Sequence, residues 1–127
     1  MNTSQLQTEI ATIEKWFEEH DHALTTLNEM IHNWELTVPL FTKEYQGTLD
    51  EYMNDIAPRE LIQIFCDKAS NELKEYILAK VKNFDQEFLQ NTLETEKLRD
   101  FAKKNNYSTW LYRKPKKLHQ AFLDEFE

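Results

Sequence analysis

Apolar residues along the first third of the chain repeat with the spacing of one helix face. Intervals of four and three residues alternate, as in a heptad repeat, through Leu6, Ile10, Ile13, Phe17, His20, Leu24, Leu27, Ile31 and Trp34. Ser4 and Gln7 have the spacing of a capping box. The pattern predicts one long helix over about residues 5–35, which ends at Val38-Pro39.

Four or five shorter helices are predicted in the rest of the chain. Thr48 and Glu51 form another capping box, and Pro58 stands where a new helix tolerates proline, at its first position. Ser70 restarts the helical pattern. Thr92 is expected to cap a further helix that ends at Asn105-Asn106, and Pro115 is expected to open the last one. The predicted buried positions are Leu61, Ile64, Phe65, Leu73, Ile77, Val81, Phe84, Phe88, Leu98, Phe101, Leu118, Phe122 and Phe126, with Tyr76 and Leu89 widening the stripe of residues 73–88.

Composition supports an all-α fold with a single domain over residues 1–127. One glycine and three prolines are too few for the turns of an all-β protein, and 40% hydrophobic residues are enough for one core. The predicted architecture is a helical bundle with one long N-terminal helix. The N-terminal segment has no signal-peptide pattern and no apolar run spans a membrane, so a soluble cytoplasmic protein is expected. Cys66 is expected to be a buried hydrophobe.

Charge divides the chain into an acidic body and a basic segment. The net charge is −8, yet seven of the 15 Lys and Arg residues lie in 99–120, where Asp100 is the only acid. An acidic body repels phosphate and attracts basic surfaces over long range. The expected partner is therefore a basic protein surface, and nucleic acid is disfavoured as a ligand because its binders carry a basic face.

The histidines and carboxylates do not form a recognisable catalytic or metal-binding set. Two Glu-x-x-His pairs, Glu19 with His22 and Glu29 with His32, lie on the same predicted helix. Ten residues of helix separate them by about 15 Å, too far to share a bridged metal pair. His20 is a lone histidine on the apolar seam, which offers no second ligand. No phosphate loop or nucleophile set is present, so no enzyme activity, metal or cofactor is predicted.

A second group of polar residues stands beside apolar ones in a way that suggests burial. An arginine held by Asp85 or Asp55, with an aromatic ring stacked on its plane, would fix short helices in register. In the stretch "YSTWLYRKPKKL", residues 107–118, the rings and Arg113 are expected inside and the lysines outside. The predicted structural network comprises Tyr52, Asp55, Arg59, Asp85, Trp110 and Arg113.

Three segments carry motifs that occur together in a known group of proteins. They are "DEYMNDIAPRELIQIF" (50–65), "NFDQEFLQNTLE" (83–94) and "TWLYRKPKKL" (109–118). In this order, a Tyr/Asp-rich helix start with a following Arg, a D-x-x-F-x-x-x-T segment and a Trp-rich stretch ending in Arg-x-Pro resemble small acidic bacterial immunity proteins of polymorphic or contact-dependent toxin systems. The resemblance covers residues 50–118 and implies a protein that blocks a toxin domain.

Charge and resemblance together lead to a functional hypothesis. The chain is expected to be a non-catalytic protein-binding module, an immunity protein that occludes the basic surface of a toxin domain, such as a nuclease. The residues expected to pair with that surface are Glu18, Glu19, Asp21, Glu29, Asp50, Glu51 and Glu60. The alternative is a helical adaptor or self-associating scaffold, a homodimer for example, that uses the heptad seam of residues 6–34.

Overall fold

The computed structural model describes residues 2–20, 25–119 and 122. Over these residues the chain is predominantly helical, as the sequence predicts. The elements are α1 (Thr3–Glu19), α2 (Leu27–Thr37), the 3₁₀ helix η1 (Val38–Phe41), α3 (Leu49–Lys68), α4 (Asn71–Gln90), β1 (Thr92–Glu94), α5 (Glu96–Lys104), the 3₁₀ helix η2 (Thr109–Tyr112) and β2 (Arg113–Pro115).

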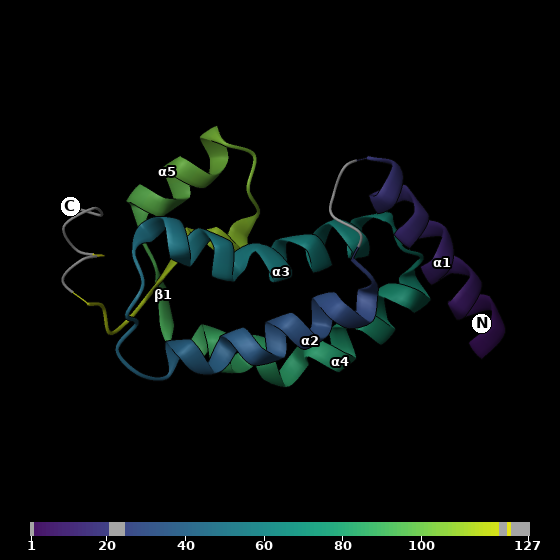
Figure 1. Cartoon of the computed structure of the whole chain (residues 1–127), viewed down its shortest axis with the longest axis horizontal. Helices are drawn as coiled ribbons and strands as arrows, with labels where there is room; N and C mark the ends of the chain where they lie inside the picture. The colour runs from purple at the N-terminus through teal and green to yellow at the C-terminus, as the bar shows by residue number, and fades with distance from the viewer. Residues whose placement is uncertain (1, 21–24, 120–121, 123–127) are drawn as a thin grey trace.

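Three helices form the body of the molecule, with smaller elements at its two ends. In Figure 1, α2, α3 and α4 run lengthwise beside one another, and α2 and α3 make the most extensive contact between elements. The first helix, α1, crosses the end where α3 turns into α4 (Figure 1). At the opposite end lie α5 and the antiparallel pair of strands β1 and β2 (Figure 1).

The core is rich in aromatic side chains. Phe41, Tyr52 and Phe88 are at most 2% exposed and make edge-to-face contacts, with ring centroids 5.7 Å apart for Phe41 and Tyr52 and 5.3 Å apart for Phe41 and Phe88. Trp34, fully buried, lies 5.2 Å from Phe88. Each such ring pair adds about 0.5–1.5 kcal/mol beyond burial of its surface. The cluster joins η1, α2, α3 and α4.

The prediction of one long helix over residues 5–35 is wrong, because this segment contains two helices, α1 and α2. The first ends at Glu19, and the hydroxyl of Thr26 accepts from the amide of Glu29 to cap the second. Phe17 and Leu27 are both buried in the same core, so the heptad spacing continues across the break without one continuous helix. The capping box at the N-terminus is formed by Asn2 and Gln5 rather than by Ser4 and Gln7.

The prediction that Pro58 opens a new helix is also wrong. The capping box of Thr48 and Glu51 is confirmed, but the helix it opens continues unbroken to Lys68 with Pro58 in its interior. Pro58 has no amide hydrogen for the carbonyl four residues before it. Buried Ile56 and Ile62, on either side of the proline, hold both halves against the same core and offset that loss.

Two strands replace the helix starts predicted near the C-terminus. Thr92 begins β1, and its partner in the antiparallel register is Pro115, which ends β2. The cap of α5 is Thr95, whose hydroxyl accepts from the Leu98 amide. The predicted end of this helix is confirmed, with Asn105 at its C-cap and Asn106 at a φ of 62°.

Burial follows most of the predicted stripes. Ser70 caps α4 as predicted. The residues Leu73, Ile77, Val81 and Phe88 are buried, and so is Cys66. Tyr76 and Leu89, expected to widen the stripe of α4, are instead 41% and 42% exposed. Phe126 lies outside the described residues.

Three glutamates connect distant parts of the chain by accepting hydrogen bonds at the start of a helix. Glu9 accepts from the amide and hydroxyl of Ser70, at 2.6 and 2.7 Å. Glu14 accepts from the Leu27 amide at 2.7 Å, and Glu60 from the amide and hydroxyl of Ser108 at 3.0 and 2.7 Å. A carboxylate is favoured there because helix N-termini present unpaired amides and a partial positive charge. These contacts orient α2, α4 and η2.

Replacing Pro58 by alanine is expected to stabilise the protein. Alanine restores the missing amide hydrogen inside α3 and removes the helix penalty of proline, at the cost of a more flexible unfolded chain, for a net gain of about 2 kcal/mol. Urea denaturation measures it as a higher midpoint with an unchanged slope. Ala57→Gly, at the exposed neighbouring position, should shift the midpoint the other way. An unchanged midpoint for Pro58→Ala would contradict the argument.

Candidate functional site

A largely buried polar cluster is centred on Asp85 of α4. Arg59 of α3 donates from Nε to Oδ1 at 3.0 Å and from Nη2 to Oδ2 at 3.1 Å, and Trp34 of α2 donates to Oδ1 at 2.9 Å. Trp110 of η2 covers the guanidinium, with the Arg59 Cζ 4.0 Å from its ring centroid. The predicted arginine, held by Asp85 and stacked on a ring, is therefore present.

This cluster supports the fold and leaves little of itself accessible. Arg59 is 1% exposed, and its Nη1 has no acceptor among the described residues. A buried guanidinium is tolerated here because the paired carboxylate and the stacked indole offset its lost hydration. Together with Trp34 and Trp110, this ion pair joins α2, α3 and α4 and fixes η2 against them.

The other predicted members of this network belong to two separate groups. The hydroxyl of Tyr52 donates to the backbone carbonyl of Arg113. The Arg113 side chain donates to the Thr92 hydroxyl at 2.9 Å and to the carbonyls of Thr92 and Leu89 at 2.9 and 3.2 Å. Asp55 accepts from the hydroxyl of Tyr45. The sequence indicates that these residues make structural contacts. It does not indicate that Tyr52 and Arg113 form one group and Asp55 and Tyr45 another.

Burial raises the pKa of two tyrosines in these groups. It is the main cause at both Tyr45 and Tyr52, and for Tyr45 the neighbouring carboxylate of Asp55 adds to the effect. Both phenols lie 3% exposed or less. Each therefore strongly favours its protonated form in the folded protein.

The stretch 107–118 is only partly turned inward. Leu111 is buried, Trp110 and Arg113 are half-buried, and Lys116 and Lys117 are exposed. Tyr107, expected inside, is 41% exposed and stacks on Phe101, with ring centroids 6.2 Å apart. This segment mainly closes the fold.

The acidic residues predicted to bind a partner do not form one continuous surface. Glu18 and Glu19 lie at the end of α1, beside the C-terminal end of α3, where Lys68 sits 3.5 Å from the ring centroid of Trp16. Asp50 and Glu51 lie in the first turn of α3, a helix of 20 residues and thus about 30 Å long. Two groups of carboxylates therefore face different ends of the molecule.

Several of these carboxylates also have partners within the chain. Glu60 binds Ser108 and is not a free surface charge, and Glu51 completes the capping box of α3. Glu29, at the start of α2, accepts from the hydroxyl of Thr26 at 3.3 Å, and Glu19 forms an exposed ion pair with Lys15 at 3.9 Å. Asp21 lies outside the described residues.

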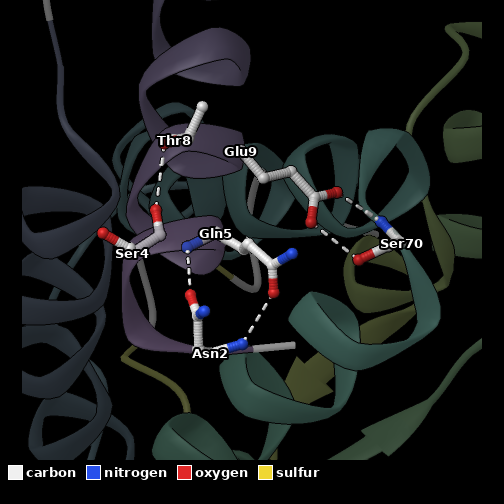
Figure 2. Close-up of a pocket in the computed structure, with 6 residues that line it drawn as sticks. All are labelled: Asn2, Ser4, Gln5, Thr8, Glu9 and Ser70. Atoms are coloured by element: carbon white, nitrogen blue, oxygen red, sulfur yellow. Dashed lines mark hydrogen bonds between the residues drawn. The ribbon is translucent and has the colours of Figure 1, made fainter.

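The hollow drawn in Figure 2 lies between the start of α1 and the start of α4. It has a volume of about 440 Å³ and is lined by Asn2, Ser4, Gln5, Thr8, Glu9 and Ser70. The figure shows hydrogen bonds among these residues, between Asn2 and Gln5, between Thr8 and the Ser4 carbonyl, and between Glu9 and Ser70 (Figure 2). The hollow is a structural joint with no converging reactive groups.

The histidines that the structure describes do not gather ligands for a metal. His20, predicted on the apolar seam, is exposed at the end of α1 and stacks on Trp16 at 4.4 Å between ring centroids. His32 lies 3.5 Å from Glu35, and His22 lies outside the described residues. Within residues 2–20, 25–119 and 122, no three His, Cys, Asp or Glu side chains are grouped so that they could hold a metal ion.

Cys66 is buried in the core, and burial raises the pKa of its thiol. The reactive thiolate form is therefore disfavoured in the folded chain. This agrees with the prediction that Cys66 acts as a small hydrophobic side chain.

Most described positions of the heptad seam are covered by this chain, the exposed His20 excepted. Ile13, Phe17, Leu27 and Trp34 are 6% exposed or less, and Leu6, Ile10 and Ile31 pack against the same core. Leu24 lies outside the described residues. The seam that a self-associating scaffold would need is thus used for folding.

Comparisons with known proteins give no relative. No protein-family model, no curated protein and no solved structure matches the chain. Among the described helices, none has the length and apolar character needed to cross a membrane.

Breaking the pair of Arg59 and Asp85 is expected to cost more stability than removing both partners. Arg59→Met leaves the Asp85 carboxylate without its counter-charge and should lower the free energy of unfolding by about 3 kcal/mol. Arg59→Met/Asp85→Leu should recover part of that loss, because no charge is left unpaired, although the buried indole N–H of Trp34 loses its acceptor. Urea denaturation of the two single variants and the double variant measures the coupling. A double variant as unstable as the sum of its single variants would refute this account.

High pH is expected to unfold the protein through its buried tyrosines. Because the folded-state pKa of Tyr45 and Tyr52 is raised, their contribution to stability is complete below the unfolded value of about 10 and is lost as pH rises above it. Their tyrosinate absorbance should therefore appear together with loss of helical circular dichroism. Tyr45→Phe and Tyr52→Phe should each reduce the amount of tyrosinate absorbance that appears as the helices unfold. Ionisation of either residue while the helices persist would contradict this expectation.

Proposed function

We propose that the chain is a non-catalytic binding protein that neutralises a toxin domain by covering that domain's basic surface. The main support is its charge: a net charge of −8 with exposed carboxylates at both ends of the helical body. Such a field raises the rate at which a cationic partner is encountered. The resemblance of residues 50–118 to immunity proteins of toxin systems points to the same class of partner.

The proposed mechanism requires occlusion without chemistry. A stable complex of this kind buries roughly 800 Å² on each partner, with a few large apolar side chains at its centre and charged side chains around them. The chain offers large apolar side chains at its surface, Leu36 and Leu40 being 61% and 50% exposed. Its exposed carboxylates supply the rim. Fast capture matters because a toxin acts until it is bound.

Co-expression tests this function directly. Where a neighbouring reading frame encodes a secreted protein, the C-terminal domain of that protein is the partner to use. Cells that produce this domain are expected to survive when they also produce the chain, and the purified proteins are expected to form a one-to-one complex. The association rate should fall steeply as salt is raised, because screening weakens steering.

The control for this experiment is an unrelated acidic helical protein of similar net charge. If it protects the cells equally, charge alone explains the effect and specific neutralisation is refuted. Equal cell death with and without the chain would also end the proposal. A complex whose association rate is indifferent to salt would refute the charge-driven mechanism while leaving the binding intact.

A further inference from the structure

The two most exposed large apolar side chains among the described residues lie close together. Leu36, near the end of α2, is 61% exposed, and Leu40, in η1, is 50% exposed. They are four residues apart on consecutive helical segments, which places them on neighbouring turns of one surface. Neighbouring leucines that remain in water are a common mark of an interaction site.

A hollow begins at Leu40 and extends to the first turns of α3. It has a volume of about 540 Å³ and is lined by Pro39, Leu40, Thr42, Lys43, Glu44, Tyr45, Gln46, Gly47, Glu51 and Asp55. Hydrogen bonds of Tyr45 fix the segment that bounds this hollow. The backbone of Tyr45 bonds with residues 117 and 119, at 2.8 and 3.0 Å, and its hydroxyl donates to Asp55.

Gly47, the one glycine of the sequence, is required by this arrangement. A β-carbon at position 47 would stand 2.7 Å from the Tyr45 hydroxyl oxygen and 2.8 Å from two ring carbons. Because Tyr45 is 3% exposed and bonded to Asp55, its ring has little room to move aside. The absence of a side chain at position 47 thus allows the tyrosine to form the wall of the hollow.

The rim of this hollow is acidic. Three carboxylates line it, those of Glu44, Glu51 and Asp55, against the single ammonium of Lys43. Each also accepts a hydrogen bond within the chain, from Gln46, Thr48 and Tyr45 respectively, and still contributes its negative charge to the rim. Lys117 lies beside Tyr45 through its backbone and does not line the hollow.

Two other hollows have a weaker charge imbalance. The one between α1 and α2 is lined by Glu14 and Glu18 with Lys15. The one on α4 is lined by Glu75 and Asp85 with Lys82. Neither brings together three carboxylates and a leucine as exposed as Leu40.

We propose that this hollow is where the partner docks, receiving a lysine or arginine side chain flanked by apolar side chains. The inference rests on the proposed function and narrows it to one surface, at the corner of η1 and α3. Leu36 and Leu40 would pack against the apolar side chains on either side of the partner's lysine or arginine. The carboxylates would orient the cation, since opposite charges around an apolar contact fix register and exclude acidic partners. The carboxylates at the end of α1 would then act in long-range attraction without direct contact.

A peptide titration tests this surface without the toxin. The probe is a short acetylated and amidated peptide that alternates leucine and arginine, added to the ¹⁵N-labelled full chain, and a matched peptide carries glutamate in place of arginine. The basic peptide is expected to shift amide resonances of residues 39–47 and of the first turns of α3 in a saturable way. The acidic peptide is expected to shift none of them.

Matched variants give the second readout. Leu40→Ser and Glu44→Lys should each remove the shifts at the peptide concentration that half-saturates the unchanged protein. Leu93→Ser and Glu18→Lys make the same chemical changes at exposed positions elsewhere and should leave the titration unaltered. All four positions are at the surface, and the amide spectrum of each variant reports whether its fold is retained.

Three results would overturn the proposal: shifts centred on the end of α1 or on α4, equal shifts with the acidic peptide, or no shifts up to about 1 mM peptide. None of these results bears on whether co-expression protects cells. Failure of this docking site is therefore distinguishable from failure of the proposed function. If cells are protected and these shifts are absent, the partner binds elsewhere on the chain.

Discussion

The structure depends on one carboxylate, that of Asp85. It accepts hydrogen bonds from Arg59 and Trp34, so a single side chain of α4 fixes the relative positions of α2, α3 and α4. The indole of Trp110 then closes the site over the guanidinium. The geometry is demanding because a buried ion pair contributes little unless each partner is well placed, and separating the two leaves a charge without solvent. The main effect of such a contact is to favour one arrangement of the helices over others. Its net contribution to the free energy of unfolding is small.

Acidic side chains in this protein have two roles. Glu9, Glu14 and Glu60 hold helix starts in place from distant parts of the chain. Others, such as Glu18 and Asp50, remain exposed and create the negative field on which the proposed function relies. Net charge alone cannot separate these roles, because a carboxylate that accepts from backbone amides still counts as one negative charge. This is why a surface inferred from composition included Glu60, which is occupied.

The sequence predicts local features well and long-range ones poorly. The caps at Thr48 and Ser70 and the apolar stripe of α4 follow from short spacings. The pairing of an arginine with Asp85, which lies 26 positions from Arg59, is anticipated from side-chain chemistry rather than from spacing. The pairing of β1 with β2 does not, because it joins segments about twenty residues apart whose own patterns are too short to read. The break after α1 was hidden for another reason: α1 and α2 bury their apolar faces in one core, so the apolar period continues along the sequence although they are separate helices.

Through the backbone contacts of Tyr45, the position of the loop before α3 depends on a distant part of the chain. Its position is set by residues 117 and 119, more than seventy positions later in the sequence. The rim of the acidic hollow is thus shaped by a segment that supplies none of its lining. Substitutions in that segment can therefore change the shape of the hollow while every side chain that lines it stays the same. Under the proposed docking, such substitutions would change partner recognition without altering Leu36 or Leu40.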